Sequence, residues 1–450
     1  MPKRQMKLTA FCHPPGHWLM PGAKPTDMDF EECVHMARVA ERGLFDMLFF
    51  QDSAAVAPAF YLPGGGAEAL AEAARCVRLE PLTLLAALAP MTKHIGLIAT
   101  VTTTYNDPFN VARKFATIDH ISKGRAGWNL VTSQNVDEAQ NFSQNEHMAH
   151  DLRYERAQEF YDVVTGLWDS WEDDAIIRDH DTGKYIDPKK VHVLNHEGKH
   201  FKVRGPLNVA RPIQGNPIIA QAGSSEPGRE LAARTADVVF TAQVSLEEAQ
   251  AFYSDVRGRM PKYGRSPDDI RIMPGIRYVL GHTESEAKER YDMMLGEASI
   301  EGMLKSVQRL CGDLDIRKYD IDGPLPDLPP SNAAKARQKM MIDLARRENL
   351  SIRELARRFT FSLGHMVFVG TPKRLADFME DWFTRDACDG FTMLSPYFPE
   401  PLEMFVENVV PELQRRGLFR TAYEGRTLRE NLGLKFKPHR VAAQRETVPA

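Results

Sequence analysis

At 450 residues the chain exceeds a usual single domain but matches a (β/α)8 barrel with insertions, and its 43% hydrophobic and 26% charged residues are ordinary for a globular protein. The net charge of −4, without a basic tract, gives no electrostatic reason to expect binding to nucleic acid or to a membrane surface. The five cysteines are scattered without a CxxC pair, and no apolar run is long enough for a signal peptide or a membrane span, so we expect a cytoplasmic protein with reduced thiols, no disulfide framework and no zinc cluster.

Short apolar runs recur along the chain and predict strands buried between helices. In chain order they are Lys7–Phe11, Phe45–Phe50, Ile95–Val101, Ala126–Val131, Pro217–Gly223, Asp237–Ala242, Ile270–Leu280 and Gly390–Leu394. Helical patterns follow most of them. This eightfold alternation indicates parallel strands with right-handed crossovers, and it favours a closed (β/α)8, or TIM, barrel over an open doubly wound sheet. No GxGxxG motif follows the first strand, which also argues against a dinucleotide-binding fold.

Three stretches interrupt the alternation, and we expect them to be insertions in one barrel domain spanning residues 1–450. They cover about 54–80, 172–211 and 298–365. The remainder, 418–450, is expected to be a tail that wraps the barrel or a neighbouring subunit.

The most informative stretch of the sequence is 127–160, GWNLVTSQNVDEAQNFSQNEHMAHDLRYERAQEF. A buried strand is followed by a polar loop of about 15 residues, which is long enough to suggest function. A helical pattern follows Asp151 and places His150 and Tyr154 near the helix N-terminus, where unpaired N–H groups and the helix dipole favour an anion. The stretch suits a phosphorylated, hydrogen-bonding ligand such as a flavin nucleotide. The alternative is a capped helix after a core strand.

In a (β/α)8 barrel the active site lies at the C-terminal ends of the strands. The polar residues at these ends, or in the loops beyond them, are His13, His17, Asp52, Thr102, Thr103, Asn129, Ser133, Gln134, His150, Tyr154, Ser224 and Ser225. This set lacks paired carboxylates for glycoside hydrolysis, a metal-binding pair and a strand-end lysine for a Schiff base. Many donors and acceptors without a nucleophile indicate an organic cofactor that performs the reaction.

The histidines have competing interpretations. His13 and His17 are the candidate catalytic residues, because imidazole transfers protons near neutral pH, but both could be ordinary loop residues. His192 and His196 are four apart, yet Pro188 and Gly198 flank them, so we read them as surface histidines and expect no metal site.

Several long motifs resemble the bacterial luciferase-like flavin monooxygenases. They are RAGWNLVTS, HDLRYERAQEFYDVVTGLWDSW and GKHFKVRGPLNVARPIQGNPIIAQAGSSEPGRELAA, with EPLTLLAALAPMTKHIGL, TVTTTYNDPF and DIDGPLPDLP elsewhere. Within that family the chain is most similar to the branch of the nitrilotriacetate, EDTA and dibenzothiophene sulfone monooxygenases, with the nitrilotriacetate enzyme's large component the most alike. The likeness extends from about Lys7 to Leu434.

The resemblance implies a barrel that uses FMNH₂, supplied by a separate NAD(P)H:FMN reductase, and O₂ as co-substrate. A flavin peroxide would insert one oxygen atom into a small organic substrate. Matched by motif, the FMN contacts would be Asp52, Thr102, Asn129, Ser133, His150, Tyr154, Ser224 and Ser225, with Tyr154 and Ser225 near the phosphate. Gln134 is also predicted to contact FMN, because it follows Ser133 at the end of the same strand. It departs from the alkane monooxygenases of this branch, which look to have a histidine after the same VTS motif.

We therefore expect a two-component FMNH₂-dependent monooxygenase, with an aminopolycarboxylate or related xenobiotic as a candidate substrate. A homodimer or homotetramer is expected. Two alternatives stay open: a deazaflavin-dependent oxidoreductase on the same barrel, and a non-catalytic flavin-binding protein.

Overall fold

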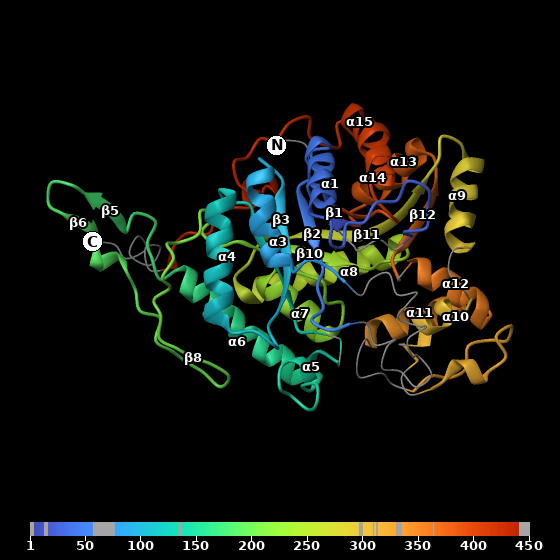
Figure 1. Cartoon of the computed structure of the whole chain (residues 1–450), viewed down its shortest axis with the longest axis horizontal. Coiled ribbons are helices and arrows are strands. Elements are labelled where there is room, and N and C mark those ends of the chain that lie inside the picture. The colour runs from blue at the N-terminus through green and yellow to red at the C-terminus, as the bar shows by residue number, and fades with distance from the viewer. Residues whose placement is uncertain are drawn as a thin grey trace.

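The computed structural model describes residues 4–12, 17–56, 77–133, 135, 137–296, 300–308, 310–311, 314–329, 335–362 and 364–440. Within these ranges, eight parallel strands close into a barrel, which confirms the predicted (β/α)8 class (Figure 1). In order around the barrel they are β1 (Lys7–Cys12), β2 (Met47–Phe50), β3 (Gly96–Thr102), β4 (Ala126–Val131), β9 (Ile218–Gln221), β10 (Val238–Thr241), β11 (Arg271–Leu280) and β13 (Gly390–Leu394), which pairs with β1.

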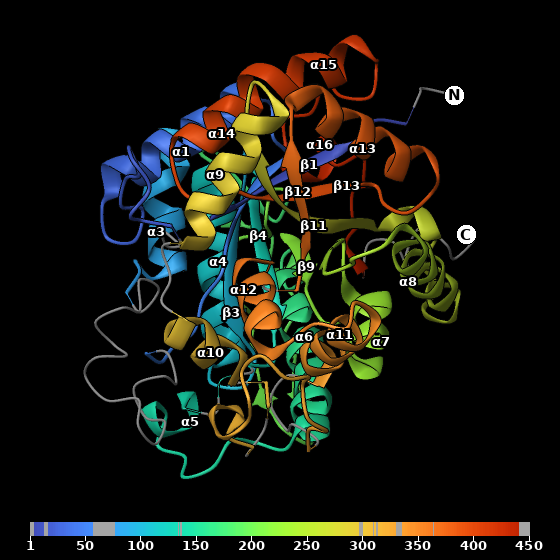
Figure 2. The ribbon, with the colours of Figure 1, turned by 90° about the vertical axis from the view of Figure 1, so that its right-hand side faces the viewer.

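Helices between the strands form the outer layer of the barrel (Figure 2). They are α1 (Phe30–Arg42), α3 (Pro81–Leu88), α4 (Pro108–Ser122), α6 (His150–Trp168), α7 (Glu226–Thr235), α8 (Leu246–Arg259), α9 (Glu284–Gly296), α13 (Pro372–Thr384), α14 (Glu400–Met404) and α15 (Val410–Arg415). A π-helical turn, Phe405–Val409, joins the last two. No helix in the described ranges combines the length and the apolar character needed to cross a membrane.

The β2 strand shows why an almost wholly apolar sequence suits this position. All four of its residues are buried, and successive side chains point to opposite faces. Met47 and Phe49 pack inside the barrel, whereas Leu48 and Phe50 belong to the cluster beneath the surrounding helices. Apolar surface is thus needed on both faces.

One further strand, β12 (Met366–Gly370), had no counterpart among the sequence predictions. The ten-residue β11 pairs with β10 over its first part, and β12 pairs with its C-terminal part from Ile276 to Leu280. The extra strand therefore extends β11 outside the closed ring, leaving the eight-strand barrel unchanged.

Two of the expected insertions have structure of their own. The first carries two small antiparallel pairs, β5 (Ile176–Asp179) with β6 (Lys184–Ile186) and β7 (His196–Glu197) with β8 (Lys202–Val203), and it projects away from the barrel in Figure 1. The second contains α10 (Ile300–Gln308), α11 (Lys335–Arg347) and α12 (Ile352–Ser362), which share a hydrophobic cluster. Both views place these three helices at the same end of the molecule as α5 (Glu138–Asn141) in the loop after β4.

The C-terminal tail closes the opposite end of the barrel. Its short helix α16 (Leu428–Asn431) places Leu428 in the cluster that fills the barrel interior. Two buried arginines hold the tail: Arg420 pairs with Asp46, and Arg429 pairs with Asp237 at 3.0 Å. The described part of the tail therefore wraps its own barrel.

Candidate active site

A cavity of about 620 Å³ opens at the C-terminal ends of the barrel strands, here called the barrel mouth. Its apolar floor contains Phe11, Phe49 and Phe240, whose ring centroids lie 5.0–5.7 Å apart. Polar groups from the strand ends form its walls. The cavity can therefore hold a flat apolar group with hydrogen-bonding edges.

Five of the residues singled out from the sequence line this cavity: Asp52, Thr102, Asn129, Ser133 and Tyr154. Asn129 is 4% exposed, and its Nδ2 donates to Thr100 Oγ1 at 2.8 Å. Asn129 Oδ1 is buried and has no hydrogen-bond partner among the described residues. A buried amide oxygen without a partner is costly, and because Asn129 lines the cavity, a ligand bound there is a candidate source of the missing donor.

Tyr154, His150 and Ser225 meet at one side of the mouth. Tyr154 Oη lies 3.4 Å from Ser225 Oγ, and the ring centroids of Tyr154 and His150 are 4.9 Å apart. Ser225 is the N-cap of α7, accepting from Gly228 N at 3.3 Å, and Ser224 precedes it. The start of α6 at His150 has no side-chain cap. Hydroxyls and two helix N-termini in one place form a suitable environment for a phosphate.

The backbone packs tightly at a glycine beside this cluster. A Cβ on Gly223, which lines the cavity, would lie 3.1 Å from Gly228 Cα and 3.3 Å from Tyr154 Oη. The close approach of these two backbones lets α7 start directly at the cavity edge.

The buried carboxylate of Glu138 on α5 is a site residue that the sequence analysis did not identify. It is 4% exposed and accepts hydrogen bonds from Ser53 Oγ at 2.8 Å and from Ser133 Oγ. Ser133 Oγ also lies 2.8 Å from Thr102 Oγ1. Glu138 therefore ties the loop after β2 to the loop after β4, and nothing in its sequence context distinguished it from other acidic loop residues.

Beneath Ser133 lies a buried polar network that was also missed. Arg153 is 2% exposed and donates to the carbonyl of Ser133 at 2.5 Å and to His147. Tyr105 Oη contacts the other imidazole nitrogen of His147 at 2.6 Å. Burial, together with the charge of Arg153, lowers the pKa of His147 to about 4. A neutral His147 thus helps to hold Ser133 in its left-handed conformation, with φ 57°.

The remaining sequence candidates have different outcomes. His17 is half-buried, with its ring 5.3 Å from that of Phe361 at the end of α12, and it is not among the cavity-lining residues. His13 and Gln134 lie outside the described residues. His192 and His196 contact different carboxylates, those of Glu172 and Glu159.

Asp52 is the cavity residue with an altered acidity. Burial raises its pKa from 3.8 to about 6, partly opposed by a backbone hydrogen bond from Ser53 and by the charge of Arg78. Its carboxyl therefore changes from donor-capable to acceptor-only close to neutral pH.

The raised pKa of Asp52 gives a testable pH dependence. The folded state holds the Asp52 proton more tightly than the unfolded state, so the protein loses stability as the pH rises from about 4 to about 6. Asp52→Asn removes this contribution. Urea denaturation of both proteins should show their difference in unfolding free energy changing across that window and constant above about pH 7. A constant difference from pH 4 upward contradicts the assignment.

Comparison with known proteins gives a consistent result over nearly the whole chain. The sequence matches the family described as "Luciferase-like monooxygenase" over residues 6–387. It is 51% identical over 430 residues to nitrilotriacetate monooxygenase component A of Aminobacter aminovorans, covering 95% of each chain. It is 47% identical over 448 residues to N-acetyl-S-(2-succino)cysteine monooxygenase of Bacillus subtilis, covering 98% of this chain and 99% of that one. The structure is similar to the crystal structure of DmoA from Hyphomicrobium sulfonivorans, with a TM-score of 0.86, 32% identity, and coverage of 98% of this chain and 95% of that chain.

Proposed function

Because the chain belongs to the luciferase-like monooxygenase family, we propose that it is the oxygenase component of a two-component system that uses FMNH₂ and O₂ to insert one oxygen atom into a small organic substrate. A separate NAD(P)H:FMN reductase would supply the reduced flavin. The relatives of this chain are named as monooxygenases. The cavity at the barrel mouth supports the same function, because it combines an apolar floor with polar walls.

The observation that carries the proposal is a buried amide oxygen without a partner among the described residues, Asn129 Oδ1, on a residue that lines the cavity beside Tyr154 and Ser225. A flavin nucleotide carries a group suited to each of these two places. Its ring N–H can donate to the buried amide oxygen of Asn129, and its phosphate can accept from the hydroxyls of Tyr154 and Ser225 at the helix N-terminus. The residues present therefore fit FMN. Asp52, Thr102 and Ser133 would contact the ring system or the ribityl chain, and His150 and Ser224 would lie near the phosphate.

Reduced FMN, when bound, supplies the electrons that activate O₂. The protein's own task is to hold the flavin and to exclude water. Phe11, Phe49 and Phe240 would form an apolar floor for the ring. Helices α10–α12 lie at the same end of the molecule as α5, whose Glu138 lines the mouth.

We further propose a polycarboxylate as the substrate, with an aminopolycarboxylate as the first candidate. Nitrilotriacetate and N-acetyl-S-(2-succino)cysteine, named for the two relatives above, both carry several carboxylates around a nitrogen or sulfur atom. The described residues that line the cavity include Lys114, a cation that an anionic substrate could approach.

A labelling experiment tests this function. The protein, FMN, NADH and a flavin reductase are incubated under ¹⁸O₂ with nitrilotriacetate, N-acetyl-S-(2-succino)cysteine or dibenzothiophene sulfone, with catalase present to remove free peroxide. We expect an ¹⁸O-labelled product from a polycarboxylate, dependent on both protein and reductase, and none from the uncharged sulfone. A product that forms without O₂ contradicts a monooxygenase, and oxidation of the sulfone alone contradicts the substrate class.

A further inference from the structure

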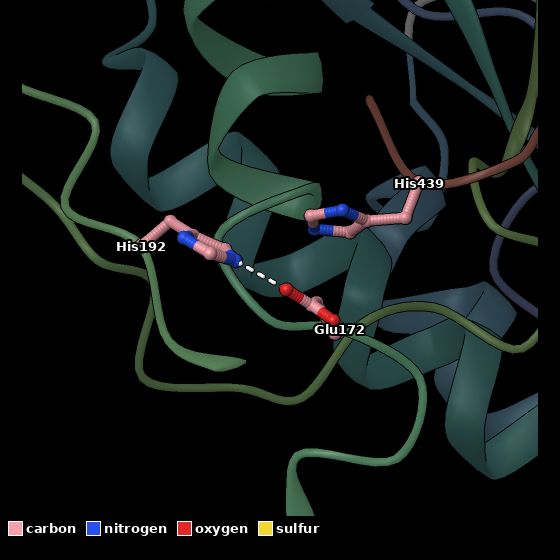
Figure 3. Close-up of side chains that lie close together, drawn as sticks. All are labelled: Glu172, His192 and His439. Atoms are coloured by element: carbon pink, nitrogen blue, oxygen red, sulfur yellow. Dashed lines mark hydrogen bonds and ion pairs between the residues drawn. The ribbon is translucent and has the colours of Figure 1, made fainter. Parts of the chain in front are cut away.

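Two imidazoles and a carboxylate converge at the far end of α6 from the barrel mouth. They belong to Glu172, His192 and His439, and one ligand atom from each lies within 4.8 Å of the others (Figure 3). His192 Nε2 is 2.8 Å from Glu172 Oε1, and the rings of His192 and His439 have centroids 5.4 Å apart. This grouping is distinct from the proposed flavin site, because the 19-residue α6 spans about 28 Å between His150 and this end.

The three side chains are presented by segments whose backbones are fixed to one another. Glu172 N donates to Lys190 O at 3.0 Å and His192 N donates to Ser170 O at 2.8 Å, so these two segments run side by side. The tail brings His439, whose Nε2 contacts the carbonyl oxygen of Asp169 at 2.7 Å.

Further contacts secure the tail beside these segments. Arg211 donates to the carbonyl of Lys437 at 2.8 Å, and Arg440 pairs with Asp169 at 3.1 Å. The candidate ligands therefore come from three segments that are already docked, and little conformational freedom is left to lose on binding.

Burial adds to the case for a ligand. Glu172 is 8% exposed and His439 is 3% exposed, whereas the His192 side chain is 24% exposed. Two imidazole nitrogens and one carboxylate oxygen match the three protein ligands of a four-coordinate zinc ion, with water as the fourth. Ligand atoms around zinc lie about 3.3 Å apart, so the cluster needs only small side-chain rotations to close.

We propose that Glu172, His192 and His439 bind a divalent transition-metal ion of the zinc class, which fastens the C-terminal tail to the segment that follows α6. The ion would replace the direct contact between His192 Nε2 and Glu172 Oε1. Its role is structural, because the site lies at the opposite end of α6 from the cavity.

The test uses the untagged full-length protein, freed of metal with a chelator and then titrated with Zn²⁺ by calorimetry. We expect one Zn²⁺ per chain, with a Kd on the order of micromolar or tighter. His192→Gln should weaken binding at least about tenfold, and so should Glu172→Gln, which keeps the side-chain volume. His196→Gln is the matched control, because the His196 side chain is equally exposed at 23% and pairs with Glu159 outside the cluster.

Two further readouts separate a built site from loose surface binding. Co²⁺ should give the visible absorption bands of a four-coordinate ion, and Zn²⁺ should raise the thermal unfolding midpoint of the protein and of His196→Gln but not of His192→Gln. Uptake below one ion per chain at micromolar Zn²⁺, or equal affinity in His192→Gln and His196→Gln, overturns the proposal.

Discussion

Ser225→Asp is expected to weaken FMN binding by about 2–4 kcal/mol, on the order of 30- to 1000-fold, while riboflavin affinity changes little. Asp is as good an N-cap as Ser, so the start of α7 should remain intact. The new carboxylate, however, would lie beside Tyr154 where we place the phosphate, and it replaces a hydrogen-bond donor by a like charge. Fluorescence titration with FMN and with riboflavin measures both affinities.

The control for this variant is Ser245→Asp. Ser245 is the N-cap of α8 and accepts from Glu248 N at 3.2 Å, so the change adds the same charge at an equivalent helix start. Ser245 does not line the cavity. If both variants lose FMN affinity equally, or if Ser225→Asp loses riboflavin as well, the phosphate does not bind at Ser225.

Asn129→Leu is expected to weaken FMN and riboflavin binding equally, by about 1–3 kcal/mol, or about 5- to 150-fold. The reason is that Asn129 Oδ1 would accept from the ring system, which both molecules share, whereas the phosphate belongs to FMN alone. Leucine has a similar volume but no acceptor. The same titrations therefore assign opposite ends of the flavin to Asn129 and Ser225.

Asn216→Leu is the matched control for Asn129→Leu. Asn216 is also buried, at 6% exposed, has a side-chain nitrogen without a described partner, and precedes β9 at the opposite end of the barrel. It should affect unfolding but leave both flavin affinities unchanged. Unchanged affinities in Asn129→Leu would show that its buried oxygen serves another purpose.

The fold was predictable because each barrel strand is a short apolar run whose period and spacing can be read directly. The run Met366–Gly370 is equally apolar, but its sequence does not reveal that β12 pairs outside the ring with the second part of β11. A local pattern predicts that a strand exists, whereas its neighbour is decided by contacts far away in the chain.

The same limit applies to the site. The rule that function gathers at strand ends placed Asp52, Thr102, Asn129 and Ser133 on one cavity, because parallel strands bring their carboxyl ends together. Glu138 reaches that cavity from a short helix inside a polar loop. The helix is too short to show a hydrophobic repeat, so the sequence did not predict where Glu138 would lie.

The histidine cluster shows the limit most clearly. In the sequence, His192 was considered only together with His196, because the two are four residues apart. In the fold, His192 instead meets Glu172 and His439, which is contributed by the tail. Only the three-dimensional structure brings these residues together.

The most direct test of the flavin assignment is a crystal structure of the protein soaked with FMN. We predict the phosphate within hydrogen-bonding distance of Tyr154 Oη and Ser225 Oγ at the start of α7, and the ring system over the phenylalanine floor with a donor facing Asn129 Oδ1. FMN bound elsewhere on the molecule, or in this cavity with its phosphate directed away from Ser225, would contradict the account.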